Sequence, residues 1–339
     1  MSGLTGAAVV AGVVGDPVAH SLSPRIHGAW IAAAGLDAAY VPLRVTSEGF
    51  AAFVAGLRGG VIRGVNVTIP HKEAALALAD EADLMARHSG AANLLLFHDD
   101  GKVEARNTDG LGLLYAFARQ APRLDLTAAP VVVIGAGGAA RGACAALVAA
   151  EVPEIRIVNR TWERAAALAK AFPRARAVDY GDMVRAFKGA GAVVNATACG
   201  LNGKDDLLAP MGPLPDTAVV MDMVYKPLRT GLARAAAARG LTVVDGLSML
   251  IGQAIPSFEA FYGVRPPEDV DARALALAAI GESDCSCSAS PARSAWARPR
   301  PPACSRPKAC RCMTPTRRCT PSTPRAGRRW RRSKPCSPV

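Results

Sequence analysis

Residues 131–141 read VVVIGAGGAAR, an apolar run followed at once by a glycine-rich loop. The run VVVI predicts a short buried strand, and the Ala-rich segment after the loop predicts a helix to about residue 150. Within the pattern G-x-G-x-x-A, Gly135 permits the tight turn, Gly137 lets a pyrophosphate approach the backbone, and Ala140 lets helix and strand pack closely. This order is typical of a dinucleotide-binding unit. The alternative is a glycine loop without function.

The second strand of this unit is expected at Ile155–Val158. Proteins that bind NAD usually end this strand with Asp or Glu, which holds the ribose 2′-hydroxyl. Here Asn159, Arg160 and Thr161 follow the strand, with Arg164 one turn later. No carboxylate repels a 2′-phosphate and two guanidinium groups could bind it, so the sequence favours NADP over NAD. The alternative is that both arginines belong to a solvated helix start.

Short apolar runs recur at residues 192–195, 219–224 and 242–244, with helix-like segments between them. Strands that alternate with helices in this way predict an α/β fold with a doubly wound parallel sheet over residues 131–244. Ligands of such sheets bind at the carboxyl ends of the strands, which is where we expect the cofactor.

A second informative stretch, GVNVTIPHK, occupies residues 64–72. Its β-branched residues predict a strand over residues 61–69, and residues 73–83 predict a helix. Lys72 then lies in the first turn of that helix, where it could pass a proton. Asp109 stands at the start of another predicted helix and would act with Lys72 only if the fold brings them together. The alternatives are a solvated lysine and a capping carboxylate.

Two serines stand at the start of the first predicted helix. Ser23 suits the N-cap and Pro24 the first helical position. With Ser21, Ser23 would point hydroxyl groups toward free backbone N–H groups, an arrangement that suits a small carboxylate. The alternative is a plain helix cap. Asn93 and Gln253 interrupt apolar segments, and a buried amide needs either protein partners or a ligand.

The formal net charge of +12 is unevenly distributed. Fourteen of the 40 Lys and Arg but only one of the 28 Asp and Glu lie in residues 283–339, so the first 282 residues carry −1 and the last 57 carry +13. This tail also holds seven of the nine cysteines and ten prolines, and we expect it to be disordered. It could be an inert appendage, a nucleic-acid-binding arm or a translated reading-frame error.

No apolar run reaches the roughly 18 residues of a membrane span, and no basic segment precedes the first apolar run. Cys144 and Cys199 are well separated and imply no disulfide framework, while the cysteine pairs of the tail lack the spacing of a zinc site. We therefore expect a cytoplasmic protein without a metal and without a membrane or nucleic-acid partner.

Taken together, the motifs resemble those of the shikimate dehydrogenase family from about residue 9 to about residue 280. No single motif is decisive, but their order and spacing are specific. The motifs are Ser21-Leu22-Ser23-Pro24, Asn66-Val67-Thr68-Ile69-Pro70-His71-Lys72, Asn107-Thr108-Asp109-Gly110, Gly135 to Ala139, Asn159-Arg160-Thr161, Asp222-Met223-Val224-Tyr225, and Asp245-Gly246 with Gln253.

The resemblance implies reversible, NADP-dependent oxidation of shikimate to 3-dehydroshikimate within aromatic amino-acid (chorismate) biosynthesis. It implies that Lys72 and Asp109 form the catalytic pair. The implied substrate residues are Ser21, Ser23, Asn66, Thr68, Asn93, Tyr225 and Gln253. The implied cofactor residues are Gly135, Ala136, Gly137, Gly138, Ala139, Asn159, Arg160, Thr161, Arg164, Met223 and Gly246.

The same resemblance implies two α/β domains with the active site in the cleft between them. Residues 1–104, completed by helices in residues 245–282, would bind the substrate, and residues 105–244 would form a Rossmann-like NADP domain. Members of the family occur as monomers and as homodimers. The chain departs from the family at Leu94, where a Thr is usual, and at its tail. A quinate/shikimate dehydrogenase of broader specificity and a non-catalytic NADP-binding regulator stay open as alternatives.

Overall fold

The computed structural model describes residues 4–281, which form two six-stranded sheets. In the first sheet the strand order is β2-β1-β3-β5-β6-β4. Strand β1 pairs in parallel with β2 and β3, whereas β5 is antiparallel to both β3 and β6. The strands are β1 (Val9–Gly15), β2 (Ala38–Arg44), β3 (Ile62–Val67), β4 (Glu81–Ala82), β5 (Leu94–Phe97) and β6 (Val103–Arg106). The first sheet is therefore mixed.

The second sheet is parallel throughout, in the order β12-β11-β10-β7-β8-β9. Its strands are β7 (Val131–Ile134), β8 (Ile155–Val158), β9 (Ala175–Val178), β10 (Ala192–Asn195), β11 (Val219–Asp222) and β12 (Thr242–Asp245). From β7 the chain adds strands toward one edge of the sheet, and from β10 it adds them toward the other edge. The position between β7 and β10 is therefore the switch point of a doubly wound fold. The predicted parallel sheet is confirmed.

Helices cover both faces of the second sheet. Val131 and Val133 of β7 point into one apolar cluster, and Val132 and Ile134 point into another, as the period of two in a strand requires. The short helices that accompany the two sheets are α1 (Ser23–Ala33), α2 (Phe50–Leu57), α3 (Lys72–Leu78), α4 (Leu84–Ser89), α6 (Gly138–Ala149), α7 (Trp162–Lys170), α8 (Met183–Phe187) and α9 (Gly231–Ala238), with 3-10 turns at Tyr180–Asp182 and Leu201–Gly203.

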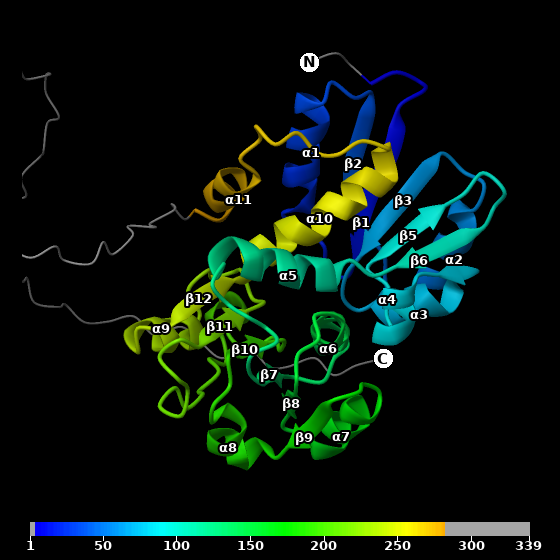
Figure 1. The fold of residues 1–339 in the computed structure, drawn as a ribbon. Coiled ribbons are helices and arrows are strands. Elements are labelled where there is room, and N and C mark those ends of the chain that lie inside the picture. Colours follow the sequence, from blue (N-terminus) through cyan, green and yellow to red (C-terminus); the bar gives the residue numbers. More distant parts are fainter. Residues whose placement is uncertain (1–3, 282–339) are drawn as a thin grey trace, which may run out of the picture. The chain divides into compact units, whose positions relative to one another are not determined.

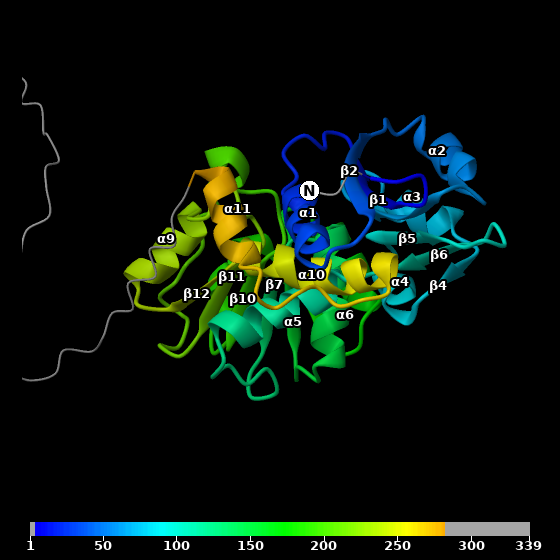
Figure 2. The ribbon, with the colours of Figure 1, turned by 90° about the horizontal axis from the view of Figure 1, so that it is seen from above.

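Helices α5 (Asp109–Gln120) and α10 (Gly246–Tyr262) lie side by side between the two sheets (Figures 1 and 2), and α11 (Ala272–Ile280) follows them. Two glycines allow the close approach of α5 and α10. A Cβ atom on Gly112 would lie 2.5 Å from the carbonyl oxygen of Met249, and one on Gly252 would lie 2.6 Å from Cβ of Tyr115. The chain leaves the first sheet through α5 and returns to it through α10.

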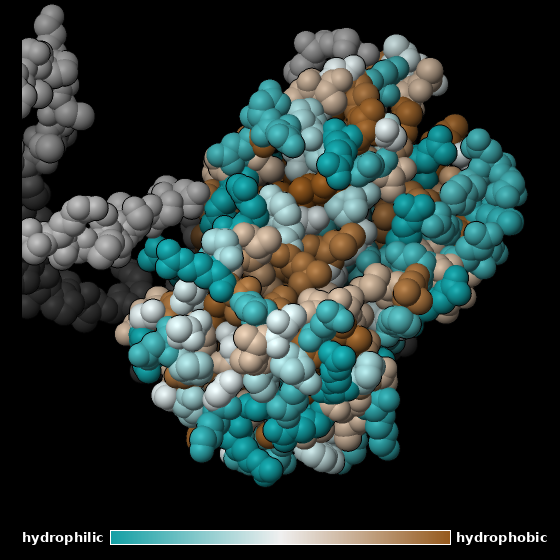
Figure 3. Space-filling model, in the orientation of Figure 1, coloured by the Kyte–Doolittle hydropathy of each residue, from teal (hydrophilic) through white to brown (hydrophobic). Residues whose placement is uncertain are grey.

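Hydrophilic side chains cover much of the surface in Figure 3, and apolar side chains gather near its middle, over α5 and α10. Within residues 4–281, no helix combines the length and apolar character that crossing a bilayer requires.

Two local predictions are wrong. The helix expected over residues 73–83 ends at Leu78, because Asp80 accepts a hydrogen bond from the Val103 backbone and Asp83 caps a separate helix, α4. The N-cap of α1 is Leu22 rather than Ser23. Ser23 is instead the first helical residue, and its backbone N–H donates to Oγ of Ser21 at 3.3 Å. The predicted tail, residues 283–339, lies outside the described residues.

Candidate active site

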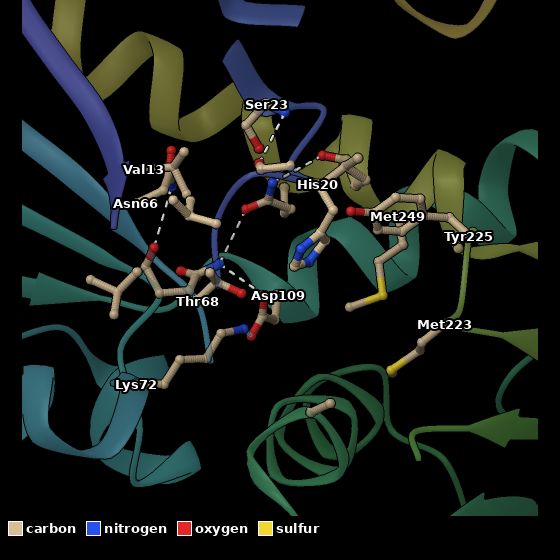
Figure 4. Close-up of a pocket in the computed structure, with 18 residues that line it drawn as sticks. Val13, His20, Ser23, Asn66, Thr68, Lys72, Asp109, Met223, Tyr225 and Met249 are labelled. Carbon is tan, nitrogen blue, oxygen red and sulfur yellow. Dashed lines mark hydrogen bonds and ion pairs between the residues drawn. The ribbon is translucent and has the colours of Figure 1, made fainter. Parts of the chain in front are cut away.

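A cavity of about 240 Å³ opens where the carboxyl ends of β1, β3 and β11 meet the first turns of α5 and α10. Both sheets contribute to its wall, so residues far apart in sequence face one another across it (Figure 4). Its lining consists of Val13, Val18, His20, Ser21, Ser23, Asn66, Val67, Thr68, Lys72, Asn93, Asp109, Ala139, Met223, Tyr225, Gly246, Met249, Leu250 and Gln253.

Lys72 and Asp109 converge inside this cavity (Figure 4). Nζ of Lys72 donates to Oδ2 of Asp109 at 2.6 Å. The side chains are 21% and 9% exposed, so the pair is largely shielded from water but open to a molecule in the cavity. A short charge-assisted bond of this kind fixes the direction of the ammonium group.

The backbone holds both partners at the starts of helices. Lys72 is the first residue of α3, and its carbonyl oxygen accepts a hydrogen bond from the Ala92 backbone at 2.8 Å. Asp109 is the first residue of α5, and its N–H donates to Oδ1 of Asn107 at 3.0 Å. The Asn107 amide in turn donates to Oγ of Ser89 at 2.9 Å. Hydrogen bonds to the segments that contain Ser89, Ala92 and Asn107 therefore fix the positions of Lys72 and Asp109.

Asn93 connects the ion pair to α10. Its Nδ2 atom lies 2.9 Å from Oδ1 of Asp109 and 3.3 Å from Oε1 of Gln253, and its Oδ1 atom accepts from the Thr108 backbone at 2.8 Å. Oδ1 of Asp109, the carboxylate oxygen that does not contact Lys72, thus accepts a hydrogen bond from the Asn93 amide. This orients the carboxylate toward Lys72.

Asn66 is held from two sides. Tyr40 donates its hydroxyl hydrogen to Oδ1 of Asn66 at 2.8 Å, and Nδ2 of Asn66 donates to Oγ of Ser257 on α10 at 2.8 Å. Burial raises the pKa of Tyr40 well above its ordinary value, so the phenol keeps its proton and stays a donor. His27 stacks on the Tyr40 ring with centroids 4.0 Å apart.

The remaining predicted substrate residues also line the cavity. Ser21 and Ser23 lie at the start of α1, Thr68 follows β3, and Tyr225 follows β11. Burial raises the pKa of Tyr225, so its hydroxyl also stays protonated. Hydroxyl and amide groups from both sheets therefore surround the Lys72–Asp109 pair, as a small polyhydroxylated molecule would require.

A second cavity, of about 450 Å³, lies along the carboxyl edge of the second sheet. Gly135 takes φ of +117°, and a Cβ atom there would lie 3.0 Å from the carbonyl oxygen of Ala196. A Cβ atom on Gly137 would meet nothing within 4 Å, so space for a ligand remains beside the first turn of α6. The open cradle and the free N–H groups of a helix start suit a pyrophosphate. The residues present therefore fit a dinucleotide.

The predicted cofactor residues divide between the two cavities. Gly135, Ala136, Gly137, Asn159 and Arg160 line the second, and Ala139, Met223 and Gly246 line the first.

Three predicted cofactor residues, Gly138, Thr161 and Arg164, line neither cavity. Gly138 begins α6, Thr161 stands at the N-cap position of α7 without a side-chain capping bond, and Arg164 lies exposed in the first turn of α7. Within the described residues neither Arg160 nor Arg164 forms an ion pair, so both guanidinium groups are free to bind an anion.

Comparison with known proteins shows to which family the chain belongs. A model of the shikimate dehydrogenase substrate binding domain matches residues 13–95, and a model of shikimate / quinate 5-dehydrogenase matches residues 117–202. The NADP(+) shikimate dehydrogenase of Caulobacter vibrioides is 57% identical over 280 residues, which cover 82% of this chain and 98% of that protein. The chain belongs to the shikimate dehydrogenase family.

Solved structures of the family agree with the fold. Shikimate 5-dehydrogenase of Thermus thermophilus, in complex with NADP(H) and shikimate, matches with a TM-score of 0.70 at 36% identity over 80% of this chain and 98% of that one. Quinate dehydrogenase of Corynebacterium glutamicum, in complex with NAD, matches with a TM-score of 0.72 at 27% identity over 81% and 99%.

Several residues that line the two cavities of this shikimate dehydrogenase family member could not be recognised from the sequence. Val13, Val18, Val67, Met249 and Leu250 form apolar walls, and as ordinary core residues they carried no signal. His20 precedes the paired serines, and Figure 4 shows its ring turned into the cavity. In the second cavity, Tyr180, Thr197, Cys199 and Asp205 were not predicted. Of these four, Thr197 and Cys199 could have been indicated by their position in the Ala196-to-Gly200 run, directly after the apolar strand β10.

Proposed function

We propose that this protein catalyses the reversible oxidation of shikimate to 3-dehydroshikimate with NADP, a step of aromatic amino-acid biosynthesis. The observation that carries the proposal is the 2.6 Å contact between Lys72 and Asp109 inside a cavity of about 240 Å³. The cavity also contains Ala139 from the first turn of α6, directly after the glycine-rich loop, which supports a dinucleotide site next to the ion pair. The relatives named as NADP(+) enzymes support the choice of cofactor.

In the proposed mechanism Lys72 moves the proton. NADP, when bound, supplies hydride acceptance. A carbinol carbon loses hydride only as its hydroxyl proton leaves. In the oxidation direction Nζ of Lys72, after it has released a proton to water and is a neutral amine, accepts this proton and becomes the ammonium that pairs with Asp109; in the reverse direction that ammonium returns the proton to the ketone oxygen. Asp109 holds Nζ in place through the short ion pair, and Asn93 holds Asp109. Asp109 therefore keeps the geometry of proton transfer constant through the reaction.

We propose that Ser21 and Ser23 bind the substrate carboxylate at the start of α1. Helix N-termini favour anions, and both hydroxyl groups line the same cavity as Lys72. The remaining substrate contacts are proposed at Asn66, Thr68, Asn93, Tyr225 and Gln253. Asn66 and Asn93 are already bonded within the protein, so their orientation is set before a substrate arrives. Such preorganisation lowers the entropic cost of binding.

We propose that residues 135–139 hold the pyrophosphate and that residues 159–164 hold the adenosine 2′-phosphate. Arg160 lines the second cavity, and no carboxylate stands at the end of β8. Met223 and Gly246 line the first cavity and are proposed to border the nicotinamide; Figure 4 shows Met223 on the side opposite Lys72. The first sheet with α10 and α11 then serves the substrate and the second sheet serves NADP.

The remaining partner assignments are also proposals. Cys144 and Cys199, the cysteines of the described part, are free thiols, which supports a reducing compartment such as the cytoplasm. We propose that the enzyme needs neither a membrane nor a nucleic acid and that it works as a monomer or homodimer. The role of residues 283–339 is open to a deletion test.

The test is an initial-rate matrix that follows NADPH or NADH absorbance. Shikimate and quinate are each paired with NADP and NAD, for the full chain and for a chain that ends at Glu282. Turnover of shikimate with NADP by both chains supports the proposal and makes the tail dispensable. Similar turnover of quinate moves the assignment to a dual enzyme. NADP binding without any turnover would leave only a regulator.

A further inference from the structure

Two buried polar residues outside both cavities join the second sheet at its carboxyl edge. Asn195 ends β10 and Asp222 ends β11, and the two are register partners in the parallel pair. They are 0% and 2% exposed, and Nδ2 of Asn195 donates to Oδ1 of Asp222 at 2.9 Å. Neither residue takes part in the chemistry described above.

Asp222 holds the loop that faces the substrate. Its Oδ1 atom accepts from the Val224 backbone at 3.0 Å, and its Oδ2 atom accepts from Oγ1 of Thr230 at 2.6 Å. Val224 stands between Met223 and Tyr225, which line the 240 Å³ cavity. The conformation of these two side chains therefore depends on the Asp222 carboxylate.

Asn195 holds the loop that faces the cofactor. Its Oδ1 atom accepts from the backbone N–H of Thr197 at 3.0 Å and from Oγ1 of Thr197 at 2.7 Å. Oγ1 of Thr197 accepts in turn from the Cys199 backbone at 3.1 Å. Thr197, Ala198 and Cys199 line the 450 Å³ cavity. Nδ2 of Asn195 donates both to the Cys199 carbonyl oxygen at 3.4 Å, in the same loop, and to the Asp222 carboxylate that holds the other loop.

The same two loops meet again farther from the sheet. The backbone N–H of Asn202 donates to the carbonyl oxygen of Lys226 at 2.8 Å, one residue beyond Tyr225. Oδ1 of Asp206 accepts from the Gly231 backbone at 3.0 Å. The cofactor-side loop is therefore bonded to the substrate-side loop at two further points.

We propose that Asn195 and Asp222 are positioning residues that couple the two cavities, so that occupancy of one tightens binding in the other. This inference rests on the proposed function. Coupling requires a contiguous element that both ligands bias, and the two loops joined through Asn195 form one. A ligand that orders residues 197–199 also fixes Asn195 and, through it, the Asp222 carboxylate that holds Val224. The second ligand then loses less conformational entropy when it binds.

The experiment measures the dissociation constant of NADPH with and without saturating shikimate, by quenching of protein fluorescence. NADPH and shikimate are both reduced, so the ternary complex cannot react. The unaltered protein is expected to bind NADPH at least about fivefold more tightly with shikimate present. In Asn195→Ala this ratio should fall to within about twofold of one, while each ligand alone still binds.

Two further variants make the result decisive. Thr197→Val keeps the side-chain shape and removes the Oγ1 bonds to Asn195 and Cys199, while the backbone bond of residue 197 to Asn195 remains, so it should lower the ratio in part and keeps the proposal testable if Asn195→Ala does not fold. Val193→Ala lies on the same strand at 0% exposure, so it lowers stability without touching the pair and should keep the full ratio. A ratio unchanged in Asn195→Ala or Thr197→Val, or a ratio of one in the unaltered protein, overturns the coupling. Failure of the unaltered protein to oxidise shikimate with NADP would instead overturn the proposed function.

Discussion

The Nζ atom of Lys72 lies 2.6 Å from the Oδ2 atom of Asp109, although 37 positions separate them in the sequence. Each residue is the first of its helix, α3 or α5, and each helix follows a strand of the first sheet. The contact depends on the placement of α5, which in turn packs along α10. The chemistry of the site is thus tied to the packing of two helices.

The contact between α5 and α10 tolerates no side chain at Gly112. A Cβ atom there would lie 2.5 Å from the Met249 carbonyl and 3.0 Å from Cβ of Gln253. Gly112→Ala should lower the free energy of unfolding by about 1–3 kcal/mol through overpacking. It should also lower shikimate turnover, because α10 carries Gln253 into the cavity.

Urea denaturation and initial rates measure both effects. The matched control is Gly56→Ala in the exposed part of α2, where an added Cβ meets nothing within 4 Å. That variant should be about 0.5–1 kcal/mol more stable, because alanine is the better helix former. A Gly112→Ala protein as stable and active as the original would show that the helices are not closely packed there.

His27 should make stability depend on pH. The ring is fully buried, its nitrogens have no hydrogen-bond partner within the described residues, and burial lowers its pKa to about 3. An unfolded histidine has a pKa of about 6.5, so the unfolded state binds more protons between about pH 6.5 and pH 3. Stability from this group is therefore present above pH 6.5 and is lost as the pH falls through that window.

The variant His27→Phe removes the titrating group but keeps a ring against Tyr40. Relative to the unaltered protein it should gain about 2 kcal/mol in free energy of unfolding between pH 7 and pH 5. Chemical denaturation at the two pH values measures this gain. Phe258→Leu alters the same aromatic cluster without a titrating group, so its effect should be equal at both pH values. An equal effect of His27→Phe at both values would contradict the assignment.

Arg160 should determine the preference for NADP. It is exposed, lies at the end of β8 and lines the second cavity. Arg160→Ser should lower kcat/KM for NADP about tenfold, the equivalent of roughly 1.4 kcal/mol of charge-assisted bonding, and leave kcat/KM for NAD nearly unchanged. Lys170→Ser, at the far end of α7, is the charge-matched control and should change neither value. Equal losses with both cofactors would point to a structural role for Arg160.

The centre of the second sheet could be predicted from the sequence because β7, β10 and β11 are short, mostly apolar runs, and a strand that is buried throughout needs cover on both faces. The edge strand β9, ARAV, has no such pattern and was not predicted. The lysine, the aspartate and the paired serines could be predicted as candidates from their places at helix starts. Their meeting could not, because it depends on the pairing of β3 with β5 and on α5 against α10, contacts between distant segments.

Other features carried no local signal. Tyr40, Ser257 and Asn195 look like ordinary core or helix residues in the sequence, and only their partners reveal their roles. The helix predicted over residues 73–83 ends early, at Leu78, because the pairing of β4 with β6 outweighs the helix propensity of the alanines and leucines in this segment.

Lys72 is proposed to transfer the proton during NADP-dependent oxidation of shikimate. The most direct measurement is the rate of NADPH formation by the unaltered protein and by Lys72→Met, with shikimate affinity measured in parallel by calorimetry. Methionine keeps the length and packing of the side chain without the amine. The expected result is a fall in kcat of about 10²–10⁴-fold with the dissociation constant of shikimate changed only a few-fold. A Lys72→Met protein that turns over shikimate within a few-fold of the original would contradict the account.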